Sequence, residues 1–273
     1  MFPKTESTPE FTILYQDEWL CAIDKPCGMM VHRSSRSTDA RFIMGLLRDQ
    51  LGQRVWPVHR LDRATSGVLL FALDAETAGL IGHQMMAREV GKRYLCVVRG
   101  HTDDAGVIDH PLKAEGRGPE QDAVTEYRCL SRMELPIPIG RYPSARYSLV
   151  EARPRTGRMH QLRRHFKHLF HPIIGDTTYG EGRHNRLFRQ HLACYRMLLH
   201  ASQLDIQHPI HKKLLQLPAV PTGEFRRLIE AQFPEALSSG NVAFLMDPER
   251  VGFNHEGHEE HEGKGKGKGK GKF

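Results

Sequence analysis

The stretch HRLDRATSGVLLFALD, residues 59–74, joins a charged turn to a run of apolar residues. The apolar part, residues 67–74, predicts a buried strand. Asp62 stands between Arg60 and Arg63 just before that strand. A carboxylate in such a place needs a charged partner and hydrogen bonds. The turn that carries Asp62 is therefore expected to lead directly into the core of the domain.

Asp62 has three ordinary explanations: a surface ion pair, a helix cap or a catalytic group. Thr65, Ser66 and the backbone of Gly67 follow closely enough to supply hydrogen bonds to a structural carboxylate. Taken alone, this stretch favours a structural role, and a catalytic one needs support from other motifs.

The segments around this turn predict a domain in which strands and helices alternate. Apolar residues alternate or run together in the expected strands, and they recur at helical spacing between them. The expected elements in chain order are a hairpin over 11–26 with a polar turn at 16–18, a strand over 67–74, a helix over 75–88, and strands over 92–100 and 146–154.

GRMHQLRRHFKHLF, residues 157–170, predicts a further helix, which Thr156 is placed to cap. Its apolar residues share one helical face and its basic residues share the other. The core face is expected to comprise Met159, Leu162, Phe166 and Leu169, and the outer face Arg164, Lys167 and His168.

Composition indicates a basic protein. Lys and Arg total 39 against 32 Asp and Glu, a net charge of +7, which favours a polyanionic partner such as nucleic acid. The five cysteines include no C-x-x-C pair, which argues against a disulfide framework or a zinc ribbon and is typical of the reducing cytoplasm. No stretch resembles a signal peptide or a membrane span, so we expect a cytoplasmic protein without membrane contact.

The chain divides into one large domain and its flanks. NHEGHEEHEGKGKGKGKGKF, residues 254–273, has almost no apolar residues and is expected to be disordered. The expected divisions are an N-terminal extension over 1–10, a catalytic domain over 11–235, a C-terminal extension over 236–253 and the Gly/Lys-rich tail over 254–273.

Four motifs in order change the interpretation of Asp62: HRLDRATSGVLLFAL, KRYLCVVRG, TGRMHQLRRH and HPIIGDTTYG. Together they resemble, in order and spacing, the motifs of the RluA-type pseudouridine synthases, over about residues 11–210. The chain departs from that family where HPIHKKLL replaces the usual T-G-E turn. An H-R-L-D alone is also similar to the H-R-D of protein kinases, but no glycine-rich loop precedes it and no D-F-G follows.

The resemblance implies an α/β (α+β) fold, with a mixed, mainly antiparallel sheet flanked by helices and loops around a central catalytic cleft. It also implies isomerisation of a uridine in RNA, without a cofactor. By correspondence Asp62 is the essential carboxylate, and Arg163 pairs with it and fixes its direction. Tyr94 corresponds to the tyrosine whose ring stacks on the flipped base.

The other expected site residues support these three. Arg60 would occupy the place of the flipped base or bind flanking phosphates, and Arg164 would contact phosphate. The supporting residues around the pocket are expected to be His59, His160 and Leu199. His165 and His168 have the spacing of zinc ligands, but no cysteine or carboxylate joins them on that turn, so we expect no metal.

The substrate stays open between alternatives. The resemblance is closer to members of the family that act on tRNA, through GRYPSARYSLVE and RMLLHASQL among other stretches, which implies position 65 of a tRNA. The same reaction on ribosomal RNA is the second candidate, since substrate choice lies in loops. A non-catalytic RNA-binding protein that helps tRNA fold is the third, although a pure binder has no use for Asp62, Tyr94 and Arg163. We expect a monomer.

Overall fold

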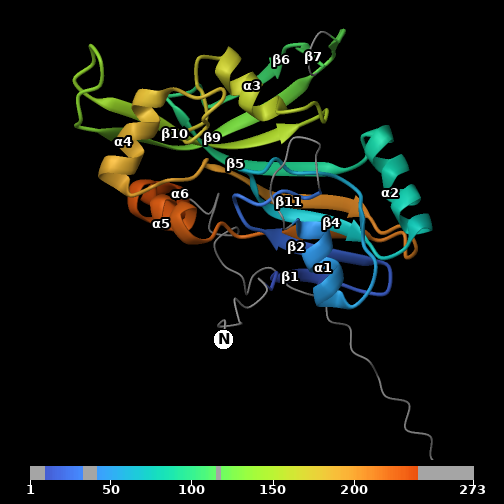
Figure 1. Ribbon diagram of the computed structural model, residues 1–273. Helices are drawn as coiled ribbons and strands as arrows, with labels where there is room; N and C mark the ends of the chain where they lie inside the picture. Colours follow the sequence, from blue (N-terminus) through green and yellow to red (C-terminus); the bar gives the residue numbers. More distant parts are fainter. Residues whose placement is uncertain (1–9, 33–41, 115–117, 239–273) are drawn as a thin grey trace, which may run out of the picture.

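The computed structural model describes residues 10–32, 42–114 and 118–238. A mixed ten-stranded sheet runs through this part of the chain, in the order β1-β2-β4-β11-β5-β10-β9-β6, with β3 beside β4 and β12 beside β11 (Figure 1). The strands along this order are β1 (Ile13–Gln16), β2 (Leu20–Lys25), β4 (Ser66–Ala72), β11 (Leu199–Gln207), β5 (Gly91–Arg99), β10 (Ala145–Pro154), β9 (Val124–Leu135) and β6 (Ala105–Asp109), with β3 (Trp56–Pro57) and β12 (Leu214–Pro218) at its side.

The sheet confirms the mainly antiparallel expectation. Among the described strands only β4 and β11 pair in parallel. Gly67 makes that pairing possible, because its backbone has φ 107° and a side chain there would overlap the Ala201 carbonyl. A separate small pair is formed by β7 (Leu112–Lys113) and β8 (Glu120–Gln121).

One half of the molecule follows the sequence expectations closely. The hairpin forms as β1 and β2, and every residue of β4 is buried. Helix α2 (Ala75–Ala87) begins at Asp74, whose carboxylate accepts a hydrogen bond from the backbone N–H of Thr77. Its Ala78, Ile81 and Met85 pack against the same core as β4, together with α1 (Ile43–Leu51). The strand that carries Asp62's turn is thus fixed on both faces.

The start of helix α3 (Gln161–His168) differs from the prediction. Thr156 does not cap it: its hydroxyl donates to the side chain of Gln161 and accepts from the N–H of Val124, which ties the preceding loop to β9. His160 stands at the N-cap with a left-handed φ of 53°. Met159 therefore lies before the helix, while Leu162 and Phe166 are buried as expected.

Helices α4 (Gly182–Leu192), α5 (Gly223–Gln232) and α6 (Pro234–Ser238) gather at the opposite end of the sheet from α2 (Figure 1). They pack on the part of the core that β9, β10 and β5 share. Ala236 of α6 is fully buried there, so the packed domain continues beyond the expected boundary at residue 235. The expected extension over 1–10, apart from residue 10, and the tail over 254–273 lie outside the described residues, as does nearly all of the extension over 236–253.

No described helix has the length and apolar character needed to cross a bilayer.

Candidate active site

A cavity of about 760 Å³ opens where the turn before β4, the start of β5, the end of α2 and the loop before α3 meet. It collects side chains that are far apart in the sequence. Seven of the eight residues expected in the site line it: His59, Arg60, Asp62, Tyr94, His160, Arg163 and Leu199. Arg164 does not line it.

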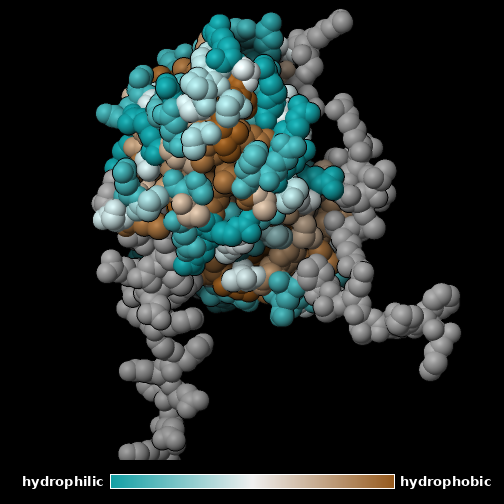
Figure 2. Space-filling view, turned by 90° about the vertical axis from the view of Figure 1, so that its left-hand side faces the viewer, coloured by the Kyte–Doolittle hydropathy of each residue, from teal (hydrophilic) through white to brown (hydrophobic). Residues whose placement is uncertain are grey.

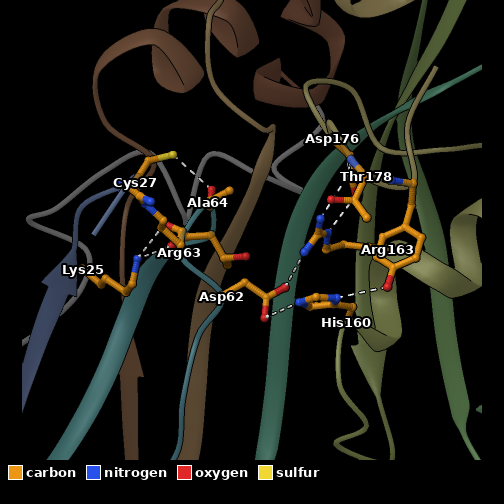
Figure 3. Close-up of polar contacts among 11 residues, drawn as sticks. Lys25, Cys27, Asp62, Arg63, Ala64, His160, Arg163, Asp176 and Thr178 are labelled. Carbon is orange, nitrogen blue, oxygen red and sulfur yellow. Dashed lines mark hydrogen bonds and ion pairs between the residues drawn. The ribbon is translucent and has the colours of Figure 1, made fainter. Parts of the chain in front are cut away.

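The turn that carries Asp62 is held in place by Lys25, the last residue of β2, and by the segment that follows it. The buried ammonium of Lys25 donates to the backbone carbonyls of Arg63 and Thr65, at 3.2 and 2.7 Å. The N–H of Gly28 donates to the Arg63 carbonyl, and the Cys27 thiol donates to the Ala64 carbonyl. Figure 3 shows the contacts of Lys25 with Arg63 and of Cys27 with Ala64 beside Asp62. The backbone on the C-terminal side of Asp62 is therefore fixed.

Lys25 is fully buried, and burial lowers its pKa to about 8. Three carbonyl oxygens accept from it, those of Pro26, Arg63 and Thr65. A buried ammonium is costly unless it is hydrogen-bonded, so this geometry offsets the cost of its burial. Its charge also lies close enough to interact with Asp62.

Arg163 stands between two carboxylates. Its Nε and Nη2 form a two-point contact with Asp176, at 2.7 and 2.9 Å, and its Nη1 donates to Asp62 Oδ2 at 3.2 Å (Figure 3). The Asp176 side chain is 0% exposed and that of Asp62 is 22% exposed. Asp176 thus holds the guanidinium plane, and the remaining N–H points at the carboxylate that faces the cavity.

The pair of Arg163 and Asp176 stays charged inside the protein. Burial alone would raise the pKa of Asp176, but hydrogen bonds from Arg163 and from the N–H groups of Thr178 and Tyr179 outweigh it, so the pKa lies below its usual range. Burial works against the charge of Arg163, and Asp176 more than compensates, so the pKa of Arg163 is raised. A permanently charged guanidinium therefore faces Asp62.

His160 closes the other side of Asp62. Its Nε2 lies 3.7 Å from Asp62 Oδ1, and its Nδ1 lies 3.1 Å from the Tyr179 hydroxyl. Burial lowers the pKa of His160 although the charge of Asp62 opposes this. A non-glycine residue with positive φ is strained, and such strain concentrates at functional sites. Here it points the imidazole at the carboxylate.

Tyr94 and Leu199 form part of the cavity wall from neighbouring strands. Tyr94 pairs with Ala201 and Leu199 pairs with Cys96 across β5 and β11, so both side chains lie on one face of the sheet. Burial, and then the charge of Asp62, raise the pKa of Tyr94, which keeps its phenol protonated at neutral pH. Leu199 is 3% exposed and gives an apolar surface. A flat ring over an apolar floor is suited to a nucleobase.

His59 and Arg60 precede Asp62 and differ in exposure. The Nε2 of His59 accepts the N–H of Leu70, and burial lowers the pKa of His59 to about 3, so its ring is neutral. Arg60 is exposed at the cavity rim. Arg164 turns away on the outer face of α3, where it donates to the Lys113 carbonyl. A contact of Arg164 with phosphate would therefore lie outside the cavity.

Sequence reasoning missed several partners. Asp176 lies within the quoted HPIIGDTTYG but is not among the expected site residues, and Lys25 lies near the end of the predicted hairpin. Thr65 and Ser66 were expected to bond Asp62. Instead the N–H of Thr65 donates to the backbone carbonyl of Asp62, and the Ser66 hydroxyl contacts His200 and Arg196. The signal for Asp176 was a lone carboxylate after an apolar run, which needs a cationic partner.

The described residues hold no group of three or more His, Cys, Asp or Glu side chains arranged for a metal ion. The Nε2 of His165 donates to the His110 carbonyl, its Nδ1 lies 2.9 Å from the Thr125 hydroxyl, and His168 stacks on His110. His255, His258 and His261 lie outside the described residues.

Solved structures with this architecture define the class of protein. Human RNA pseudouridylate synthase domain containing 1 matches with a TM-score of 0.63 and 27% identity, over 81% of this chain and 86% of that one. Human RNA pseudouridylate synthase domain containing 4 matches with the same score and identity, over 80% and 92%. The fold is that of a pseudouridine synthase.

Sequence comparison gives the family. The RNA pseudouridylate synthase family model matches residues 20–168. Proteins named tRNA pseudouridine synthase C are similar to the chain: that of Vibrio cholerae is 49% identical over 76% of this chain and 89% of its own length, and that of Haemophilus influenzae is 48% identical over 80% and 95%. The chain belongs to the RNA pseudouridylate synthase family.

Proposed function

We propose that this enzyme converts a specific uridine of tRNA, at position 65, into pseudouridine, with Asp62 as the essential carboxylate. The observation that carries the proposal is the Asp62 side chain, held by Arg163 at 3.2 Å and facing a cavity that also contains Tyr94. The choice of tRNA over ribosomal RNA is supported by the relatives named tRNA pseudouridine synthase C.

The reaction rearranges atoms without gain or loss. The bond between N1 of uracil and C1′ of ribose breaks, the base turns, and a bond from C5 to C1′ forms. The proton on C5 leaves and N1 takes one up, so no oxidant or added group is needed. Asp62 has the chemistry either to attack as a nucleophile or to handle a ribose proton. Arg163 donates a hydrogen bond to the carboxylate of Asp62 and fixes its direction.

The surroundings of Asp62 fit a base that has left its stack. Flipping a base costs a few kcal/mol of unstacking, which the receiving pocket must offset. Tyr94 would stack on the uracil and Leu199 would support it from below. The protonated phenol of Tyr94 can donate a hydrogen bond, but it is a poor base for the C5 proton.

The rim of the cavity has the charge that RNA requires. Arg60, Arg88, Arg155 and Arg158 line it together with Lys92, whose pKa burial lowers. Guanidinium groups around a concave site attract and orient phosphates. His59 and His160, neutral beside Asp62, would complete the walls around the base. Arg164 would reach RNA only from the outer face of α3.

We further propose that a single catalytic domain works as a monomer in the cytoplasm. Its division into an N-terminal extension, a domain, a C-terminal extension and a Gly/Lys-rich tail stays a prediction, with the domain continued to at least Ser238. Five free cysteines without a disulfide fit a reducing compartment.

The test is to map pseudouridine in tRNA and ribosomal RNA from cells with and without the gene, and to incubate the purified protein with tRNA transcripts. A pseudouridine that disappears from one tRNA position and is restored by the purified protein supports the proposal. Loss from ribosomal RNA alone would move the substrate to the second candidate. No loss from either RNA would contradict the reaction.

A further inference from the structure

A second cavity, of about 610 Å³, lies at the end of the sheet where α4 begins and β9 turns into β10. It shares no lining residue with the active-site cavity. Figure 1 shows α4 and this turn at the same end, and Figure 2 faces that end, where hydrophilic side chains border a strip of apolar ones. Four arginines line the second cavity: Arg99, Arg141, Arg146 and Arg183.

These arginines outnumber the carboxylates near them. Glu181 lies 3.6 Å from Arg99 and 3.0 Å from Arg183, so one carboxylate serves two guanidinium groups. Arg146 contacts Glu134 at 3.3 Å. Four positive charges therefore meet two negative ones, and the surplus favours an anionic partner.

Arg141 differs from the other three. Its guanidinium donates to the hydroxyl of Tyr142 and lies over that ring at 5.2 Å, and no salt bridge joins it to a carboxylate among the described residues. Tyr142 is 56% exposed. An exposed ring beside an arginine offers both stacking and a phosphate contact.

The turn that presents this pair has a defined shape. Ile139 and Tyr142 pair as an isolated antiparallel bridge, so the chain reverses over these residues. Gly140 has φ 58°, and a side chain there would come within 3.0 Å of Arg183 Nη1. The glycine thus allows the turn to lie against the α4 arginine, which brings separate segments into one basic surface.

The two cavities are joined by one short segment. Asp176 and Tyr179 contact Arg163 at the active site, and Glu181 and Arg183 belong to the second cavity. Arg183 is the fourth residue after Tyr179, so their Cα atoms lie at most about 14 Å apart. Tyr94 and Arg99, at odd spacing on β5, point to opposite faces of the sheet.

We propose that the second cavity binds the phosphate backbone of the same RNA whose uridine enters the active site. This rests on the proposed function. The surplus of guanidinium groups and the exposed tyrosine fit a nucleic-acid strand, which offers both phosphates and bases, better than a small anion. The contact supplies affinity and places the RNA, and it takes no part in bond exchange.

The test compares Arg141→Ala/Arg183→Ala with a control of equal charge change, Arg48→Ala/Arg226→Ala. Both control arginines are exposed, on α1 and α5, and line neither cavity. Binding to tRNA transcript is measured across a series of KCl concentrations, and conversion is measured in single turnover with saturating protein. We expect Kd to rise on the order of 10-fold, and the slope of log Kd against log salt to fall by about 1 to 2, in the cavity variant only. The single-turnover rate should be unchanged.

Binding by the cavity variant equal to that of the control would overturn this inference, even if wild-type protein makes pseudouridine in tRNA. Conversely, if wild-type protein modifies no tRNA but the cavity variant alone loses RNA affinity, the proposed function fails and the second RNA surface stands. A fall in the saturated rate with unchanged Kd would also overturn the inference, because it would place these arginines in the chemistry.

Discussion

The two arginine-containing cavities of this protein use the same side chain in opposite ways. In the active site Arg163 is 9% exposed and makes three hydrogen bonds to two carboxylates. In the second cavity Arg141, Arg146 and Arg183 are exposed, and each has at most one carboxylate near it. Burial and pairing fix a group in one geometry, whereas exposure leaves it free to meet a partner.

This difference separates chemistry from affinity. A charge that must act on one atom benefits from a rigid surround, because small misplacements of reacting groups cost large factors in rate. Phosphate contacts need charge more than fixed geometry, and surface ion pairs contribute little to stability. Substitutions in the first cavity should therefore change rate, and those in the second should change binding.

The largest effect among the supporting residues is expected at Arg163. Arg163→Met removes the partner of Asp62, so we expect the single-turnover rate to fall by about 100-fold or more. A variant with the same rate as wild type would mean that Arg163 does not position Asp62. Arg48→Met, at an exposed position of α1, is the matched control.

Arg163→Met also leaves the buried carboxylate of Asp176 without its cationic partner, which costs about 3 to 5 kcal/mol of stability. Arg163→Met/Asp176→Asn removes both charges of the buried pair and should recover part of the thermal stability. Activity should stay low in the double variant, because Asp62 still has no guanidinium beside it. Recovery of activity together with stability would assign Arg163 to the fold alone.

Tyr94 is expected to show a smaller effect, on binding. Tyr94→Phe keeps the ring and should bind tRNA nearly as wild type does, whereas Tyr94→Ala should lose about 1 to 3 kcal/mol of stacking. A binding titration with tRNA transcript measures both. Normal binding but slow conversion by the Phe variant would assign a chemical task to the hydroxyl, and equal binding by both variants would exclude stacking.

The smallest effect concerns the packing beneath the cavity. His200 is buried between the Ser66 hydroxyl and the Ala219 carbonyl, and burial lowers its pKa to about 4. Since an unfolded histidine titrates near about 6.5, the unfolded chain binds more protons between these values, and stability falls as pH falls through this window. The slope for this proton reaches about 1.4 kcal/mol per pH unit.

Urea unfolding of wild type and His200→Gln from pH 7 to pH 4 measures this slope. The variant should lose less stability over the window than wild type does. His165, whose pKa burial also lowers to about 4, should contribute to the slope that remains in the variant. Equal slopes for both proteins would show that His200 is not held neutral in the fold.

The sequence predicted the elements that local patterns specify. The hairpin, the buried strand after Asp62 and helix α2 depend on neighbouring residues, and they form as expected. The family resemblance predicted that Asp62, Tyr94 and Arg163 belong to one site. In the structure all three line one cavity.

What the sequence could not predict depends on contacts between distant segments. Asp176 fixes Arg163 only because the turn after α3 folds back on that helix, and Lys25 reaches the Asp62 turn across 38 to 40 residues of chain. The left-handed backbone of His160 moved the helix start, since no local cap signal encodes it. The second cavity likewise assembles from β5, the β9–β10 turn, the start of β10 and α4.

The most direct test of the central claim is single-turnover conversion of tRNA transcript by Asp62→Asn with protein in excess. The substitution keeps size and hydrogen-bonding reach but removes the charge and the nucleophile. A thermal melt and a binding titration run beside it. We predict a folded protein that binds tRNA about as well as wild type and forms no pseudouridine. Conversion near the wild-type rate by the folded variant would contradict the account. A destabilised variant whose folded fraction still converts uridine at the wild-type rate would return Asp62 to a structural role.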